Sequence, residues 1–289
     1  MADIRDFKCS YGNILENSQE VANKLGMAFP DAYLHSDTMA VLSKANKEGS
    51  ENIVCILPFC HTVEAEAMGA DITLGNENIG PRAKKYVYTN YEDLVNLPPI
   101  NLEKGRIHEV LLTCKMLKDQ GEYVLLEVCG PITILNMLID IKYIARGMKK
   151  NPEFMKRIFE KIGNEILRYM KEAKKYGVDF ISYADSTGGV NILGPKMAER
   201  MVEDFTYKFL KKAEKLADDK TMIMLCPKTT FALLGTEKAE FMDVKLSGPV
   251  KYMQGCIEAR GKVRMVGQQC VKNTDYVLVE SKIKEVVLR

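Results

Sequence analysis

The fold is decided by residues 152–185, PEFMKRIFEKIGNEILRYMKEAKKYGVDFISYAD. In the first part of this stretch apolar side chains recur every three or four positions, a spacing typical of a helix with one buried face. Pro152 at the first helical position and Gly177 beyond the last one predict where this helix begins and ends. The next residues, Val178–Ala184, form an apolar run that predicts a buried strand ending at Asp185. A helix that leads directly into a buried strand is half of the repeating unit of a parallel α/β sheet.

The same alternation extends to both sides of this stretch. Strands are predicted at Asn52–Cys60, Tyr123–Cys129, Thr221–Cys226, Asp243–Leu246 and Val263–Val266, and helices at Thr133–Met148 and Pro195–Leu216. Periodicity alone allows either an open doubly wound sheet or a closed barrel. No glycine-rich nucleotide-binding fingerprint follows an early strand, which favours the barrel. We therefore expect an α/β protein built as a single (β/α)8 barrel of the TIM type.

The length of 289 residues fits one barrel, so we expect a single domain over residues 1–289. Within it, residues 51–289 form the barrel and residues 1–50 a helical extension that covers it. Two helices are predicted in this extension, at Ile14–Leu25 and Thr38–Ala45. The glycines and prolines of Asp71–Pro99 predict a long irregular excursion.

The composition excludes several classes of protein. No apolar stretch approaches the ~18 residues that would span a bilayer, and the opening residues lack a signal-peptide pattern, so we expect a cytoplasmic protein without membrane segments. The net charge is +2, and the basic residues are spread along the chain, which argues against a nucleic-acid partner. Eight cysteines in such a chain are expected as reduced thiols, either buried or ligating a metal, and not as disulfides.

Several polar or sulfur-containing side chains follow directly after predicted strands. They are Cys60, His61, Cys129, Asp185, Cys226 and Cys270. Parallel α/β folds bind ligands at the carboxyl ends of their strands, so these side chains are expected to meet at one end of the fold. Thiolates and an imidazole brought together in this way would suit a zinc ion. Their spacing contains no CxxC motif, and Cys226 and Cys270 can equally be buried core residues.

Each remaining candidate has a structural alternative to its functional interpretation. His61 is either a ligand or a hydrogen-bonded structural group. Asp185 is costly to bury after an apolar strand, which points to function, but it can also be an N-cap. Glu64 and Glu66 can complement the dipole of the helix in which they lie.

Four longer segments resemble, in the same order, segments of the uroporphyrinogen decarboxylase superfamily, and in particular its corrinoid-dependent methyltransferase branch. They are PFCHTVEAEAMGADI (Pro58–Ile72), LLEVCGPITILNMLID (Leu125–Asp140), KNPEFMKRIFEKI (Lys150–Ile162) and KKYGVDFISYADSTGGVNILGPKMAERMVEDF (Lys174–Phe205). The resemblance covers roughly residues 52–270. The decarboxylase of this superfamily carries an Arg-rich, Trp-containing motif near its N-terminus, whereas this chain has no tryptophan, so porphyrinogen decarboxylation is disfavoured.

The resemblance implies transfer of a methyl group between a small-molecule donor or acceptor, such as a methoxylated aromatic, and the cobalamin of a corrinoid protein. It also implies a zinc ion that acts as a Lewis acid. In this interpretation Cys226 and Cys270 are zinc ligands, Asp185 or His61 is the third ligand, and Glu66 lines the pocket. A homodimer is left open.

Two departures from the branch keep alternatives open. Where many of its members have His-x-Cys, this chain has Met224-Leu225-Cys226, and a thioether is a poor zinc ligand. This disfavours a coenzyme M methyltransferase and is closer to the looser ligand pattern of O-demethylases. The segment after Cys270 is also too short for the branch's last helix–strand–helix. The alternatives are therefore a coenzyme M-type methyltransferase, a metal-free decarboxylase-like enzyme that uses Asp185, and a non-catalytic subunit that binds a corrinoid protein.

Overall fold

The structure, a computed structural model, describes residues 2–9, 20–28, 30–50, 52–76 and 79–289. Its centre is a seven-stranded sheet with the order β1-β4-β5-β6-β9-β11-β7. The strands are β1 (Cys55–Leu57), β4 (Val124–Cys129), β5 (Phe180–Ala184), β6 (Met222–Leu225), β9 (Met265–Val266), β11 (Lys282–Leu288) and β7 (Ala239–Lys245). The first five are mutually parallel, whereas β11 runs antiparallel to both β9 and β7. An α/β fold around a parallel sheet is thus confirmed.

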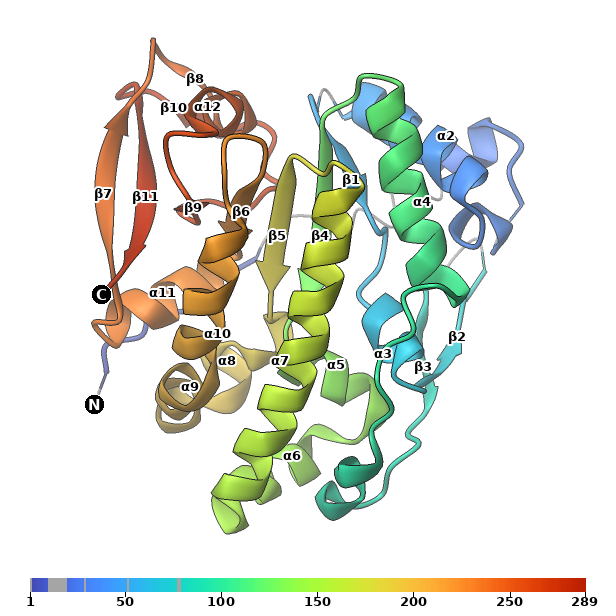
Figure 1. Ribbon diagram of the computed structural model, residues 1–289, viewed down its shortest axis with the longest axis vertical. Helices are drawn as coiled ribbons and strands as arrows, with labels where there is room; N and C mark the ends of the chain where they lie inside the picture. Colours follow the sequence, from blue (N-terminus) through green and yellow to red (C-terminus); the bar gives the residue numbers. More distant parts are fainter. Residues whose placement is uncertain (1, 10–19, 29, 51, 77–78) are drawn as a thin grey trace.

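Helices connect the parallel strands, and Figure 1 shows α4, α7 and α10 lying over the sheet. The helices are α2 (Ser36–Gly49), α3 (Val63–Ala67), α4 (Gly105–Asp119), α5 (Pro131–Leu138), α6 (Ile141–Lys150), α7 (Pro152–Lys175), α8 (Val190–Leu193), α9 (Pro195–Met201), α10 (Tyr207–Ala213), α11 (Pro227–Gly235) and α12 (Tyr252–Ala259). Short strand pairs lie outside the main sheet, β2 (Asp71–Thr73) with β3 (Arg82–Lys85) and β8 (Val250–Lys251) with β10 (Val277–Leu278). Among the described residues, no helix is both long and apolar enough to cross a bilayer.

The two faces of the sheet contribute to two different cores, because side chains alternate along each strand. From β4, Leu126 and Val128 pack into the core that also contains buried residues of α4 and α7. Leu125 points to the opposite face and packs into a second core, which contains α12. Glu127 follows Leu125 by two positions and is therefore on this second face. It stands in register with Ser182 of β5, which is itself in register with Met224 of β6.

Among the described strands, closure of the sheet into the eight-stranded barrel that the sequence predicts is not detected. In the order of the sheet β1 and β7 are the two ends, and the described residues contain no pairing between them. The segment after Cys270 supplies β11, which enters the sheet in the reverse direction between β9 and β7.

Most predicted elements are confirmed, and three are corrected. α7 lies where its sequence pattern predicts. The helix predicted at Thr133–Met148 is two helices, because the Asp140 side chain accepts a hydrogen bond from the Lys142 amide and starts α6. The helix predicted at Pro195–Leu216 contains a π-helical segment, Val202–Thr206. The excursion at residues 71–99 contains the β2–β3 pair.

The predicted N-terminal extension is described only in part. Its second helix is confirmed as α2. Most of its first helix, predicted at Ile14–Leu25, lies outside the described residues, and residues 20–24 are helical.

Candidate functional site

A buried ion pair lies where the sheet's second face approaches the carboxyl ends of the strands. The Lys272 Nζ atom is 3.4 Å from Glu127 Oε2, and the side chains are only 17% and 8% exposed. Burial lowers the pKa of Lys272, but Glu127 raises it, and the net shift is upward. The ammonium therefore stays charged at neutral pH. Glu127 comes from the middle of β4, and Lys272 from the loop after β9.

The two cysteines predicted as metal ligands lie beside this pair. Cys226 directly follows β6, Cys270 belongs to the loop after β9, and both are half-buried. Burial raises the pKa of Cys270 to about 12, with further contributions from the Cys226 thiol and the Glu127 carboxylate. Burial also raises the pKa of Cys226. Both side chains are thus neutral thiols at physiological pH in this structure.

The N-terminal segment brings a third thiol to the same place. The ring of Phe7 packs against Phe231 of α11 with centroids 6.0 Å apart, so this segment runs along α11. Cys9 follows two residues later and raises the pKa of both Cys226 and Cys270. The sequence gives no indication that Cys9 joins this group, because no predicted strand or helix contains it.

His61 also belongs to this group. Its Nδ1 atom is 3.7 Å from Cys129 Sγ at the end of β4. Burial lowers the pKa of His61, whereas Glu127 raises it and Lys272 lowers it. The net downward shift leaves a neutral imidazole at physiological pH. The charge of Glu127 raises the pKa of His61, Cys226 and Cys270 alike, whereas the meeting of these three side chains in one functional site stays a prediction.

Asp185 lies at the N-terminus of α5. Its Oδ1 accepts hydrogen bonds from the Thr133 amide and hydroxyl, both 2.8 Å away, and its Oδ2 accepts one from the Ile132 amide at 3.2 Å. Burial raises its pKa, against these hydrogen bonds, which lower it. A Cβ atom on Gly130 would lie 2.3 Å from the Cβ of Asp185, so only glycine allows this approach. Asp185 therefore caps a helix, although the capped helix is α5 and not the turn that follows Asp185. A catalytic role for it stays a prediction.

Glu66 is held by an arginine from a neighbouring helix. Arg106 of α4 is almost fully buried, and its Nη2 atom is 2.6 Å from Glu66 Oε2. The same guanidinium donates hydrogen bonds to Thr62 Oγ1 at 2.6 Å and to Cys60 Sγ at 3.1 Å. This network ties the β1–α3 loop to α4. The structure gives Glu66 this structural contact, and its place in a substrate pocket stays a prediction.

Glu64, on the same helix, is the carboxylate that reaches the end of β4. It is fully buried, and its Oε1 accepts a hydrogen bond from the Cys129 amide at 2.8 Å. Burial raises its pKa. Glu64 thus fixes the backbone that carries Cys129, the neighbour of His61.

The predicted zinc site can be tested against these contacts. Cys226, Cys270 and Glu127 have suitable donor atoms, but the Glu127 carboxylate is paired with an ammonium. Within the described part of the chain, no three His, Cys, Asp or Glu side chains are grouped closely enough to hold a metal. Met224 is buried in the second core. The residues as arranged do not fit a resident zinc ion, and Cys226 and Cys270 remain predicted ligands.

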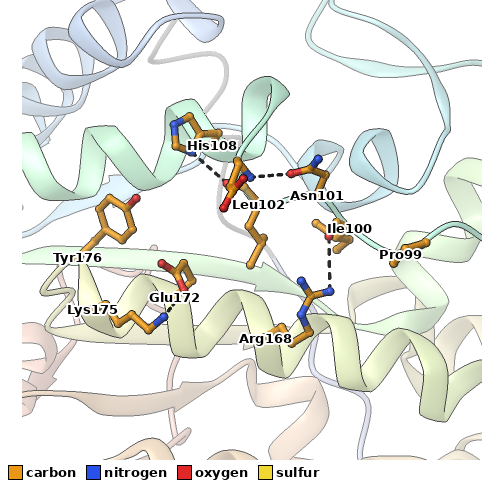
Figure 2. Close-up of a pocket in the computed structure, with 10 residues that line it drawn as sticks. Pro99, Ile100, Asn101, Leu102, His108, Arg168, Glu172, Lys175 and Tyr176 are labelled. Carbon is orange, nitrogen blue, oxygen red and sulfur yellow. Dashed lines mark hydrogen bonds and ion pairs between the residues drawn. The ribbon is translucent and has the colours of Figure 1, made fainter.

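A separate groove of about 590 Å³ lies between the segment before α4 and the outer side of α7 (Figure 2). Within α7, Arg168 pairs with Glu165 at 2.6 Å and Lys175 with Glu172 at 2.7 Å. The His108 ring is hydrogen-bonded to the Leu102 carbonyl at 3.0 Å. This groove lies over the helices and not at the carboxyl ends of the strands, so we do not assign the reaction to it.

Sequence reasoning missed Glu127 and Lys272, the most buried charged pair of this group. A signal for Glu127 was present, because it is the one charged residue within the apolar run YVLLEVC. Lys272 had no such signal, since it follows the last clear parallel strand in a loop.

Comparisons with known proteins identify the family and the fold of this chain. The family model described as uroporphyrinogen decarboxylase (URO-D) matches residues 9–250. The methylcobamide:CoM methyltransferase MtaA of Methanosarcina barkeri is 25% identical over 217 residues, which cover 74% of this chain and 63% of that protein. The methylcobamide:CoM methyltransferase MtbA of Methanosarcina acetivorans is 24% identical, with 72% and 62% covered. This chain thus spans less than two thirds of the length of these relatives.

Two further matches come from a decarboxylase and from a solved structure. The uroporphyrinogen decarboxylase of Flavobacterium johnsoniae is 28% identical over 198 residues, covering 63% of this chain and 54% of that protein. The structure of a methyltransferase from Methanosarcina mazei superposes with a TM-score of 0.64 at 24% identity, covering 75% of this chain and 64% of that one. The last match supports the shared α/β fold. With a family model that matches most of its length, this chain belongs to the uroporphyrinogen decarboxylase family, where its relatives include the methylcobamide:CoM methyltransferases.

Proposed function

We propose that this protein is a corrinoid-dependent methyltransferase, which moves a methyl group between a small molecule and the cobalamin of a partner corrinoid protein. The observation that carries the proposal is its similarity, over 217 residues, to a methylcobamide:CoM methyltransferase. A cluster of polar side chains near the carboxyl ends of β4, β6 and β9 supports the proposal, because ligands of parallel α/β folds bind at this end. The cluster consists of His61, Glu127, Cys226, Cys270 and Lys272. The small molecule is a methylated compound such as a methoxylated aromatic, or a thiol that accepts the methyl group.

The residues of this group can bind and orient a polar small molecule. Lys272 offers hydrogen-bond donors and a positive charge, and Glu127 holds it in place. His61 is a neutral imidazole and can take up or release a proton. The neutral thiols of Cys226 and Cys270 add weak donors beside them. Zinc, when bound, would polarise the substrate's oxygen or sulfur atom. The donor atoms as arranged do not fit a zinc ion.

The test uses the purified chain with free cobalamin in place of the corrinoid protein. One set of reactions offers methylcobalamin with thiols that include coenzyme M, and a second set offers reduced cobalamin with methoxylated aromatics. We expect one set to show turnover, followed by the change in cobalamin absorbance. Loss of this turnover in Lys272→Met, but not in the exposed control variant Lys245→Met, would locate the reaction at this group.

A second candidate function is a non-catalytic subunit that binds a corrinoid protein. The observation that favours it is the missing third donor for a metal within the described residues. Stable association with a corrinoid protein but no methyl transfer with any substrate offered would support this candidate and contradict the first. Sedimentation of the purified chain at several concentrations tests the homodimer. We further propose a cytoplasmic location, in keeping with the eight cysteines, all of which are free.

A further inference from the structure

The Glu127–Lys272 pair has an unusual position for two charges. Glu127 lies in the middle of a central strand whose six residues are all buried. Burying a carboxylate in such a place is costly unless a partner of opposite charge accompanies it. Lys272 is this partner, at 3.4 Å, and its own side chain is only 17% exposed. The pair is therefore a built feature of the sheet's second face and not a surface ion pair.

The sheet register places this pair next to the predicted metal ligands. Glu127 is in register with Ser182, and Ser182 with Met224. Cys226 comes two residues after Met224, and Cys270 two residues before Lys272. As described, Glu127 and the two thiols are not grouped closely enough to hold a metal, so the carboxylate could complete a three-ligand site with them only after the side chains moved closer together.

The Lys272 ammonium is already paired with the Glu127 carboxylate. A zinc ion in a protein needs at least three protein ligands in tetrahedral geometry. Zinc binding to Glu127 would have to displace Lys272 and then hold a divalent ion close to a monovalent cation, and two like charges in a poorly solvated place repel each other strongly. Within the described residues no group of three His, Cys, Asp or Glu side chains is arranged to hold a metal ion.

We propose that Lys272 itself supplies the positive charge of this site, excluding a divalent metal ion and stabilising the anion that methyl transfer creates on the small molecule. The second half of this proposal rests on the proposed function. When the methyl group leaves, its bond to the substrate's oxygen or sulfur atom breaks and the electron pair stays on that atom. The methyl group is taken up by the electron pair of the reduced cobalamin of the corrinoid protein. The Lys272 ammonium then donates a hydrogen bond to the new anion, while Glu127 keeps the ammonium in position.

The first half is tested by zinc titration of the purified full chain against a chromogenic chelator. Wild type is compared with Lys272→Met, which removes the charge but keeps an unbranched side chain, and with Lys272→Arg, which keeps the charge. Lys245→Met, on an exposed position of β7, is the matched control. The urea midpoint of each variant shows that it is folded.

We expect Lys272→Met to bind zinc at least about tenfold more tightly than wild type. A tenfold change in affinity corresponds to a modest change of ~1.4 kcal/mol in the free energy of binding. Lys272→Arg and Lys245→Met should stay close to wild type. Adding Cys226→Ser to Lys272→Met should abolish the gain, because the freed carboxylate binds together with this thiol. Tight stoichiometric zinc in wild type that is lost in Cys226→Ser would overturn the proposal, and so would an unchanged affinity in Lys272→Met.

The second half is tested in the methyl-transfer reactions after dialysis against a metal chelator. Turnover that survives dialysis and falls at least about tenfold in Lys272→Met, with less loss in Lys272→Arg, would support it. Turnover that disappears with the metal and returns with zinc would overturn it. Absence of turnover in every reaction would contradict the proposed function, whereas the zinc titration would still decide the first half.

Discussion

Replacing Asp185 by alanine separates a helix cap from a catalytic acid. In the structure its carboxylate accepts three hydrogen bonds from the first turn of α5, two at Oδ1 and one at Oδ2. Loss of a capping side chain costs about 0.5–2 kcal/mol, and leaving buried donors without a partner adds about 1–3 kcal/mol. Burial raises the pKa of Asp185, because the carboxylate loses its hydration. This loss offsets part of the stabilisation that its hydrogen bonds contribute. We therefore expect Asp185→Ala to lower the free energy of unfolding by about 2 kcal/mol.

The asparagine variant refines this prediction. Its Oδ1 can keep both contacts to Thr133, but its amide nitrogen would face the Ile132 amide, so that two donors meet. We expect a loss of about 1 kcal/mol, smaller than that of alanine. Urea unfolding followed by tyrosine fluorescence measures both, since the chain has 13 tyrosines and no tryptophan.

Asp275→Ala is the control, because its side chain is 90% exposed. A side chain so exposed should change stability by no more than about 0.5 kcal/mol. If Asp185→Ala unfolded at the same urea concentration as wild type and yet lost methyl transfer, the capping interpretation would be refuted and Asp185 would be a catalytic residue.

Three further predictions concern buried charges and thiols. Asp179 is 6% exposed and is paired with Lys118 and Arg260. Asp179→Ala should therefore lower the free energy of unfolding in urea by about 3–5 kcal/mol. A loss below about 1 kcal/mol would contradict this. Burial raises the pKa of Glu64 above its unfolded value, so its contribution to stability is fully present at acid pH and declines as pH rises through the folded-state pKa. Wild type should therefore lose stability relative to Glu64→Gln between acid and neutral pH, and parallel urea midpoints for the two proteins would count against it. The pKa of Cys270 is about 12, whereas Cys9 is exposed. Iodoacetamide near neutral pH should therefore alkylate Cys9 long before Cys270, as measured by mass spectrometry. Equal rates of alkylation would contradict the burial of Cys270.

The sequence predicts the helices and strands of this fold better than their directions. α7 and the strand after it follow from one apolar stripe, a proline and a glycine, which are local signals. The break between α5 and α6 depends on a single capping side chain, Asp140, within an otherwise helical apolar pattern. β7 and β11 alternate between exposed and more buried positions, as antiparallel strands with one solvated face do, but alternation alone does not fix the direction of a strand. For this reason residue periodicity does not show how the last strands join the sheet.

The site shows the same limit at the level of single residues. That strand ends gather their side chains follows from topology alone, and His61, Cys226 and Cys270 do share one neighbourhood. The position of a loop residue cannot be predicted in this way, since nothing local in the sequence shows that Lys272 reaches Glu127. The sequence allows Asp185 to be either a cap or a functional acid, and only the three-dimensional contacts reveal the helix that it caps.

The position of β11 has a consequence for how the chain is made. β11 includes residues close to the end of this sequence, yet it lies between β9 and β7, with seven paired residues along β7. On a ribosome, β7 therefore emerges well before the strand that will join it to the sheet. During this interval the edges of β9 and β7 are open to strands of other nascent chains, so the period before β11 emerges is the one most exposed to aggregation.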